Sequence, residues 1–266
     1  MKKMGGDYSG EETGGGERET WPLEKLEVWE DGERGSGAWN MAMDEALLRS
    51  AQIPILRCYR WGRPTLSIGY FTAIAEVRAH GSAGGGAGDE ADGAPDIVRR
   101  LTGGGVVDHA ADFAFSLVVP RMWWRGWERN PGASYARIHE ALAGALHAEG
   151  IAARLAGGGG GGAAALGSAV AAGRCFDAPV ASDVLIGDLK IAGGAQKRTR
   201  HGLLHQGSIQ LPGGRRPGAG FASALGSRLA AADVDLLAAP PPPQASALAT
   251  DLVATRYGTR AWTERC

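Results

Sequence analysis

Three consecutive glycines lie inside a basic and polar segment, RRLTGGGVVDH, at residues 99–109. Glycine has no Cβ, so the backbone of this run can approach a bound group closely. Successive backbone N–H groups also form a concave site that suits an anion or an oxyanion. Arg99 and Arg100 can add fixed positive charge. The segment therefore predicts a ligand-binding loop, and the alternative is a mobile hairpin turn.

A cysteine and a lysine stand in a second segment, Cys175 in CFDAP and Lys190 in GDLKIAGGAQKR. A thiolate is a nucleophile, and a neighbouring ammonium lowers the pKa of a thiol. This chemistry predicts that the two side chains lie close together, with His109 or His205 as an alternative base. By themselves, a lone cysteine is typical of a buried core and a lone lysine after a turn is typical of a solvated surface.

Several other motifs are absent or carry little weight. The sequence has no GxxxxGK[ST] phosphate loop and no GxSxG nucleophile elbow. His201 and His205 have a spacing that could chelate zinc on a helix, but Gly202 and the β-rich run that follows argue against a helix there. We therefore expect no metal site. The cations and aromatics that alternate over 121–127 are interpreted as a packing or partner surface rather than a nucleic-acid site.

The composition is that of a soluble globular protein. The chain has 266 residues, a formal net charge of -1 and 44% hydrophobic residues. Three cysteines are too few for a disulfide scaffold and favour a reducing compartment. No apolar stretch suggests a signal peptide, and no run approaches the roughly 18 apolar residues of a membrane span. We therefore expect a cytoplasmic protein that binds neither nucleic acid nor membrane.

Glycine is abundant, at 43 residues, and it is clustered. The clusters cannot bury enough apolar area to offset the backbone entropy lost on ordering. They predict a disordered tail at 1–20 and flexible loop insertions at 81–93 and 156–173, within a single domain over 21–266.

Between these clusters, β-rich runs alternate with two clear helical segments. The helices are predicted over 39–50 and 133–149, with a last short helix after the prolines at 240–243. Strands are predicted at 26–29, 55–59, 65–70, 96–100, 106–109, 113–119, 183–186, 190–192 and 203–211. Gly187 and Asp188 form a hairpin turn between two of them. The pattern predicts an α+β fold with a mixed, mostly antiparallel central sheet and helices packed on it.

Together, RRLTGGGVVDH, GDLKIAGGAQKR and LLHQGSI resemble the catalytic domain shared by lipoate–protein ligases, octanoyltransferases and biotin ligases. The segments WNMAMDEALL and YRWGRPTLSIGY, at 39–48 and 59–70, match the opening of that family. The resemblance implies a sheet like that of class II aminoacyl-tRNA synthetases and biotin synthetases. The GRGRxGR-type loop of biotin ligases is absent, which favours the lipoyl branch.

The resemblance also implies roles for individual residues. Cys175 resembles the nucleophile of cysteine-dependent octanoyltransferases, and Lys190 aligns with the lysine that contacts the activated acyl carbonyl. The substrate-binding residues implied by the same motifs are Arg100, Thr102, Gly103, Gly104, Gly105, His109, Gly193, Gly194, Ala195 and His205. Gly194 departs from the family, which commonly has serine there. A second departure is the glycine-rich insertion directly before Cys175.

The activity implied is ping-pong transfer of an octanoyl or lipoyl group without a cofactor or metal. An acyl carrier protein or a lipoyl carrier protein would donate the group, and a lipoyl domain or glycine-cleavage carrier protein would accept it on a lysine. The alternative is a lipoate–protein ligase that uses ATP and Mg²⁺. Two features favour the transferase: the presence of Cys175, and a short segment after Leu211 that leaves little room for an accessory domain. A non-catalytic acyl-binding protein is a third interpretation.

A locally basic stretch offers a docking surface for an acidic carrier, or else a solvated face. Its residues are Lys197, Arg198, Arg200, Arg215 and Arg216.

Overall fold

A computed structural model of the chain describes residues 23–75, 77, 94–123, 130–157, 176, 179–231, 234–237, 241 and 243–265. The predicted tail at 1–20 and the predicted insertion at 81–93 lie outside these residues, as does the insertion at 156–173 beyond residue 157. Cys175 and Cys266 also lie outside them. The disorder of these segments and the single domain over 21–266 therefore stay predictions.

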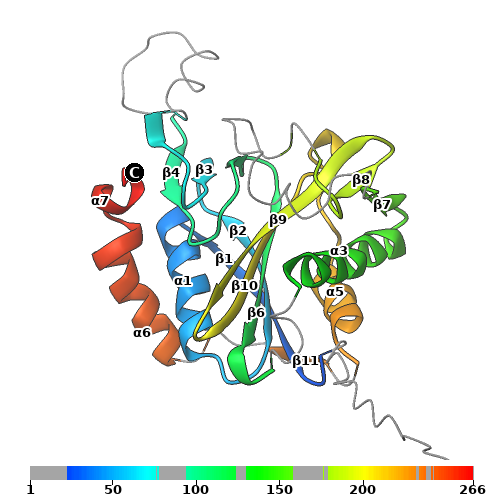
Figure 1. The fold of residues 1–266 in the computed structure, drawn as a ribbon, viewed down its shortest axis with the longest axis horizontal. Helices are drawn as coiled ribbons and strands as arrows, with labels where there is room; N and C mark the ends of the chain where they lie inside the picture. The colour runs from blue at the N-terminus through cyan, green and yellow to red at the C-terminus, as the bar shows by residue number, and fades with distance from the viewer. Residues whose placement is uncertain are drawn as a thin grey trace, which may run out of the picture.

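An eight-stranded mixed sheet forms the centre of the molecule (Figure 1). Its strands, in spatial order, are β11 (Val234–Leu237), β1 (Leu26–Gly35), β2 (Ile55–Trp61), β6 (Phe113–Pro120), β10 (Gly202–Ile209), β9 (Leu189–Thr199), β8 (Val184–Ile186) and β7 (Ala153–Leu155). β1 runs parallel to β11 and β2, whereas the other pairings described in this sheet are antiparallel. The predicted fold class is confirmed.

A smaller sheet of three strands holds the segment with the three glycines. β3 (Thr65–Ile68) lies between β4 (Asp96–Arg99), to which it is parallel, and β5 (Val106–Asp108), to which it is antiparallel. Residues 100–105, the glycine loop, connect β4 to β5. Because both ends of this loop are fixed in strands next to β3, its position over the large sheet is defined by backbone pairing.

Helices cover both faces of the large sheet (Figure 1). The helices are α1 (Gly37–Ser50), α3 (Pro131–Ala148), α5 (Phe221–Leu229), α6 (Pro243–Leu252) and α7 (Arg260–Thr263), with 3₁₀ turns at Arg121–Trp123 and Pro212–Gly214 and a π-helical turn at Val253–Tyr257. α1 begins after Ser36, whose Oγ accepts a hydrogen bond from the Trp39 amide, and α3 begins after Asn130 in the same manner. These caps satisfy amides that the first turn of a helix leaves without partners.

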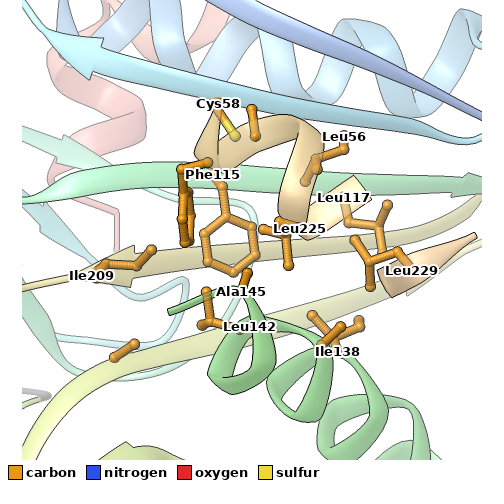
Figure 2. Close-up of a cluster of buried hydrophobic side chains, with 14 of the residues drawn as sticks. Leu56, Cys58, Phe115, Leu117, Ile138, Leu142, Ala145, Ile209, Leu225 and Leu229 are labelled. Atoms are coloured by element: carbon orange, nitrogen blue, oxygen red, sulfur yellow. The ribbon is translucent and has the colours of Figure 1, made fainter. Parts of the chain in front are cut away.

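Two apolar cores result, one on each face. α3 and α5 pack on Leu56, Cys58, Phe115 and Leu117 of the sheet (Figure 2). α1 and α6 pack on the opposite face. The strand residues there, such as Tyr59, are the sequence neighbours of those that face α3 and α5. The alternation follows from the two-residue period of a strand. The same alternation places Cys58 in the core, and burial raises the pKa of its thiol far above the ordinary value.

The predicted elements correspond closely to observed ones, with four additions among the described strands and α-helices. The predicted strand at 190–192 is the beginning of β9, which continues to Thr199. β7, α5, β11 and α7 were not predicted. Among the described residues, no helix has the length and apolarity that a bilayer crossing requires.

Candidate active site

A cleft lies between the small sheet and the large one. Its volume is about 420 Å³, which includes the part open to solvent. β3, the glycine loop and β5 contribute one side, while β9, β10, β2 and α1 contribute the other. Five of the residues implied by the sequence motifs line it: Arg100, His109, Gly193, Gly194 and Ala195. The fold therefore brings two motifs that are about 90 positions apart to one site.

Arg100 shapes the glycine loop from within. Its Nη2 donates hydrogen bonds to the carbonyls of Gly103 (2.8 Å) and Gly105 (3.0 Å), and its Nη1 donates to the carbonyl of Ser67 (2.9 Å). Gly104 has a φ of +90°, a conformation that suits glycine. The guanidinium thus holds the loop in a curve beside the cleft. Gly104 is exposed at the top of this curve.

The loop also lies very close to β3. A Cβ added to Gly69 would lie 1.8 Å from the carbonyl oxygen of Gly104, so only glycine fits at position 69. Arg99, the other arginine of the motif, is fully buried and donates to backbone carbonyls of Gly69 and Thr72 and of the C-terminal residues Thr263 and Arg265. Arg99 therefore positions backbone segments around the loop, which differs from the predicted role of adding charge to the ligand site.

Thr102 does not line the cleft. It is fully buried, and its Oγ1 donates to Oε1 of Gln206 at 2.8 Å. Gln206 Nε2 in turn donates to Asp44 at 2.7 Å, and Asp44 forms an ion pair with the buried Arg57 at 2.9 Å. This chain of contacts connects the glycine loop to α1 and β2. Gln206, which lines the cleft, was not predicted.

Lys190 lies directly behind the cleft wall formed by β9. Its Nζ forms an ion pair with Asp183 Oδ2 at 2.8 Å, and both side chains are buried. The hydroxyl of Tyr135 donates to Asp183 Oδ1 at 2.6 Å and accepts a hydrogen bond from the amide of Gly194 at 3.1 Å. A Cβ at Gly193 would lie 2.7 Å from Lys190 Cε. The two glycines therefore bring the backbone of β9 close to a buried cation.

Position 194 requires glycine, because His205 occupies the space that a side chain would need. A Cβ at position 194 would lie 2.5 Å from His205 Nε2. His205 is fully buried and lies under the cleft rather than in its lining. Burial lowers its pKa well below the ordinary value, and the neighbouring His139 adds to the effect. His205 is therefore a neutral group beneath β9, and its predicted contact with substrate would have to be indirect.

His109 lies in the cleft with both ring nitrogens engaged. Nδ1 is 2.6 Å from Asp112 Oδ2 and Nε2 is 2.6 Å from Ser67 Oγ. The ring stacks on Trp61 at a centroid distance of 4.0 Å. Ser208 Oγ donates to the same Asp112 oxygen at 2.6 Å. The sequence predicted His109 as a site residue but did not predict Asp112 or Ser67.

Cys175 falls outside the described residues, so its predicted approach to Lys190 is not tested. Its neighbour in sequence, Phe176, is described and lines the cleft. Lys190 Nζ lies 5.3 Å from the centroid of the Phe176 ring, within the range of a cation–π contact. In the described part of the chain, no group of three or more His, Cys, Asp or Glu residues is arranged to hold a metal ion.

The predicted basic stretch is not one surface. Arg198 donates to Ser134 at the beginning of α3, whereas Arg215 donates to the carbonyl of Glu149 at the end of α3. The 18 residues of α3 separate these ends by about 27 Å. Lys197 lies over the ring of Tyr70, at 5.0 Å from its centroid, so it contacts a different element from its neighbour Arg198.

Solved structures share this fold. Protein Ta0514 of Thermoplasma acidophilum, with bound lipoic acid, superposes with a TM-score of 0.64 at 21% identity over 92% of this chain and 99% of its own. A lipoate-protein ligase A bound with ATP gives 0.64 at 22% identity, over 91% and 98%. At these identities the likeness defines the fold alone, which is that of lipoate-protein ligases.

The sequence identifies the family. The model of the lipoyl protein ligase A/B catalytic domain matches residues 36–215, more than half of the chain, and the chain therefore belongs to that family. Among similar curated proteins is octanoyltransferase LipM of Kyrpidia tusciae, 37% identical over 183 residues. The match covers 67% of this chain and 63% of that protein. Octanoyltransferase LipM of Symbiobacterium thermophilum is 33% identical, with 66% and 61% covered. The chain thus spans less than two thirds of the length of these relatives.

Proposed function

We propose that this protein transfers an octanoyl or lipoyl group from a carrier thioester to a lysine of a lipoyl carrier domain, through a thioester on Cys175. The observation that carries the proposal is the cleft itself. Arg100 of the glycine loop lines one side, and the other side has a buried ammonium, Lys190, behind it. Phe176, the residue after the candidate nucleophile, lies at Lys190. The curated relatives named octanoyltransferase support the same activity.

In the first step, the thiolate of Cys175 attacks the carbonyl carbon of the donor thioester. The new C–S bond forms, the donor C–S bond breaks, and the donor thiolate leaves with the electron pair. In the second step, the amine of the acceptor lysine attacks the acyl-enzyme, the acyl C–S bond breaks, and the Cys175 thiolate leaves with the electron pair; the nitrogen loses a proton and an amide forms. Lys190 serves both steps as a nearby positive charge, for the thiolate and for the oxyanion of each tetrahedral intermediate. Asp183 holds its ammonium in place.

The walls of the cleft suit an aliphatic chain. Met41, Trp61, Val107, Phe176 and Ala195 line it. Burial of each methylene contributes about 0.8 kcal/mol, so burying an octanoyl chain contributes about 5 kcal/mol. The acyl chain is therefore the main source of affinity for the donor. Lipoyl is bulkier at its far end, and we propose octanoyl as the first substrate to test.

The partners are proposed from the same chemistry. An acyl carrier protein or a lipoyl carrier protein supplies the thioester, and a lipoyl domain or glycine-cleavage carrier protein supplies the lysine. One structure that superposes on this chain, with a TM-score of 0.57, comes from a structural analysis of a bipartite lipoate protein ligase of T. acidophilum and its E2 lipoyl domain. Lys197 and Arg198, neighbours in β9, are the proposed basic contact for an acidic carrier. The cytoplasm remains the predicted compartment.

An ATP-dependent lipoate–protein ligase is the second candidate, favoured by the ATP-bound structure that shares the fold. The glycine loop and Lys190 would serve an acyl-adenylate as well as a thioester. In that case ATP and Mg²⁺ are needed, whereas the transferase needs neither. Cys175 is the residue that distinguishes the two.

The test is acceptor acylation by Cys175→Ser, assayed with an octanoyl carrier donor and separately with free acid plus ATP. The transferase loses nearly all ATP-independent transfer, because a serine hydroxyl is a much weaker nucleophile than a thiolate. Cys266→Ser serves as the matched control and keeps wild-type transfer. Full activity of Cys175→Ser that depends on ATP would replace the transferase with the ligase, and binding without acylation by the wild-type protein would favour the non-catalytic alternative.

A further inference from the structure

Ser67, His109 and Asp112 form a continuous hydrogen-bonded line beside the cleft. The two contacts of the imidazole are both 2.6 Å long. An ionised carboxylate can only accept, so His109 Nδ1 carries the proton shared with Asp112. His109 Nε2 is then the acceptor, and the Ser67 hydroxyl donates to it. This is the order of groups in the triads that move protons during acyl transfer.

The surroundings of the line fix the orientation of its groups. Asp112 is buried, with a side-chain exposure of 0%, and its Oδ1 has no hydrogen-bond partner among the described residues. Its other oxygen faces His109. Ser67 Oγ also accepts a hydrogen bond from Arg100 Nη1 at 2.8 Å, which directs its single proton toward His109. Stacking on Trp61 fixes the ring plane. Ser67 and His109 both line the cleft.

The two half-reactions of the proposed function differ in their need for such a line. Formation of the acyl-enzyme exchanges one thiolate for another, and no proton has to leave the attacking atom. Amide formation is different, because the attacking nitrogen becomes positively charged and must lose a proton before the amide is stable. A base near the cleft is therefore needed in the second half-reaction alone.

We propose that Ser67, His109 and Asp112 form a proton relay that takes the proton from the acceptor lysine as the amide forms. This inference rests on the proposed function. The acceptor arrives as a neutral amine, its first proton having been lost to solvent. The C–N bond forms, the nitrogen gives a proton to Ser67 Oγ, and Ser67 gives its own proton to His109 Nε2. The C–S bond breaks, the Cys175 thiolate leaves with the electron pair, and His109 then releases the proton to solvent.

The first test measures the two half-reactions of the His109→Gln variant separately. Acyl-enzyme formation from an octanoyl carrier donor is followed by intact-mass measurement, and single-turnover transfer to a lipoyl domain is followed on the isolated acyl-enzyme. We expect acylation within about twofold of wild type and transfer slower by about 10² to 10⁴, the usual contribution of a positioned base. His147→Gln, an exposed histidine at the end of α3, should change neither rate. Equal slowing of both half-reactions, or unchanged transfer, would overturn the relay.

The second test distinguishes a base from a space-filling ring. Imidazole and pyrazole have the same size and shape, but pyrazole is a far weaker base. Added imidazole should restore transfer by the His109→Ala acyl-enzyme, and pyrazole should not. Restoration by both compounds, or by neither in a variant that melts like wild type, contradicts the relay. Absence of any acyl-enzyme in the wild-type protein would instead remove the proposed function, so the two failures are distinguishable.

Discussion

Glycine is required at several positions of this site, and the physical reason differs from one position to the next. Gly69 is required because its neighbour is the Gly104 carbonyl, Gly194 because its neighbour is His205, and Gly104 because of its positive φ. A Cβ at Gly103, in contrast, would meet nothing within 4 Å. Gly103 therefore has room for a side chain, unlike its neighbour Gly104.

Gly104→Ala and Gly103→Ala are a matched pair that tests this difference. Alanine at 104 is strained at a φ of +90° and would lie 3.1 Å from Arg100 Nη2. Strain of about 1 to 3 kcal/mol in the loop predicts acyl transfer slower by about 5- to 150-fold. Gly103→Ala should stay within about twofold. The measurement is kcat/KM for octanoyl transfer, with circular dichroism to show that both variants fold; similar rates would mean that the loop is only a turn.

The residues that the sequence identified are those inside continuous motifs. Arg100, His109 and Gly193 could be placed in the site because their neighbours along the chain carry the pattern. Asp183 and Asp112 were missed although each lies within a few positions of its partner, Lys190 or His109. A buried carboxylate has no sequence pattern of its own, and its role follows only from the cation or imidazole that the fold brings to it.

At the level of elements, local propensity predicted the long helices and strands and failed at the short or ambiguous ones. α1 and α3 have helix formers and clear caps, so their bounds agree with prediction to within a few residues. β7 has three residues, and α5 contains Gly226 and two serines, so neither gives a periodic signal. β9 runs through two glycines that weaken strand propensity. Pairing with β10 over Ala192–Thr199, which includes both glycines, compensates for them.

α3 contacts the site through a neutral buried histidine, which makes folding stability depend on pH. Burial lowers the pKa of His139 to about 4, whereas a histidine in an unfolded chain has a pKa of about 6.5. Between these values the unfolded chain binds a proton that the folded protein does not. Stability is therefore lost as pH falls below about 6.5, by about 1.4 kcal/mol per pH unit for this histidine, until about pH 4. His205 changes stability in the same direction.

The free energy of unfolding by urea at pH 7, 6 and 5 measures this dependence. His139→Gln removes one titrating group, so its stability should fall less steeply than that of the wild type over the same range. His147→Gln, at an exposed position, should keep the wild-type slope. Identical slopes for all three proteins would show that His139 is not held neutral by the fold.

At the scale of the whole molecule, residues from both sheets form the candidate active site. The small sheet presents the glycine loop and the Ser67–His109–Asp112 line, and the large sheet presents the glycines of β9 with Lys190 behind them. Motif order along the chain indicated the family but could not show that these parts face each other across one cleft. That arrangement depends on the long-range pairing of β6, β9 and β10.

The central claim is a covalent acyl-enzyme on Cys175, and intact-protein mass spectrometry tests it most directly. The protein is incubated with an octanoyl carrier donor in the absence of ATP. We expect one octanoyl adduct on the wild-type protein that hydroxylamine removes, and no adduct on Cys175→Ser. A wild-type protein that remains unmodified under these conditions, yet acylates a lipoyl domain when ATP and free octanoic acid are supplied, would contradict it.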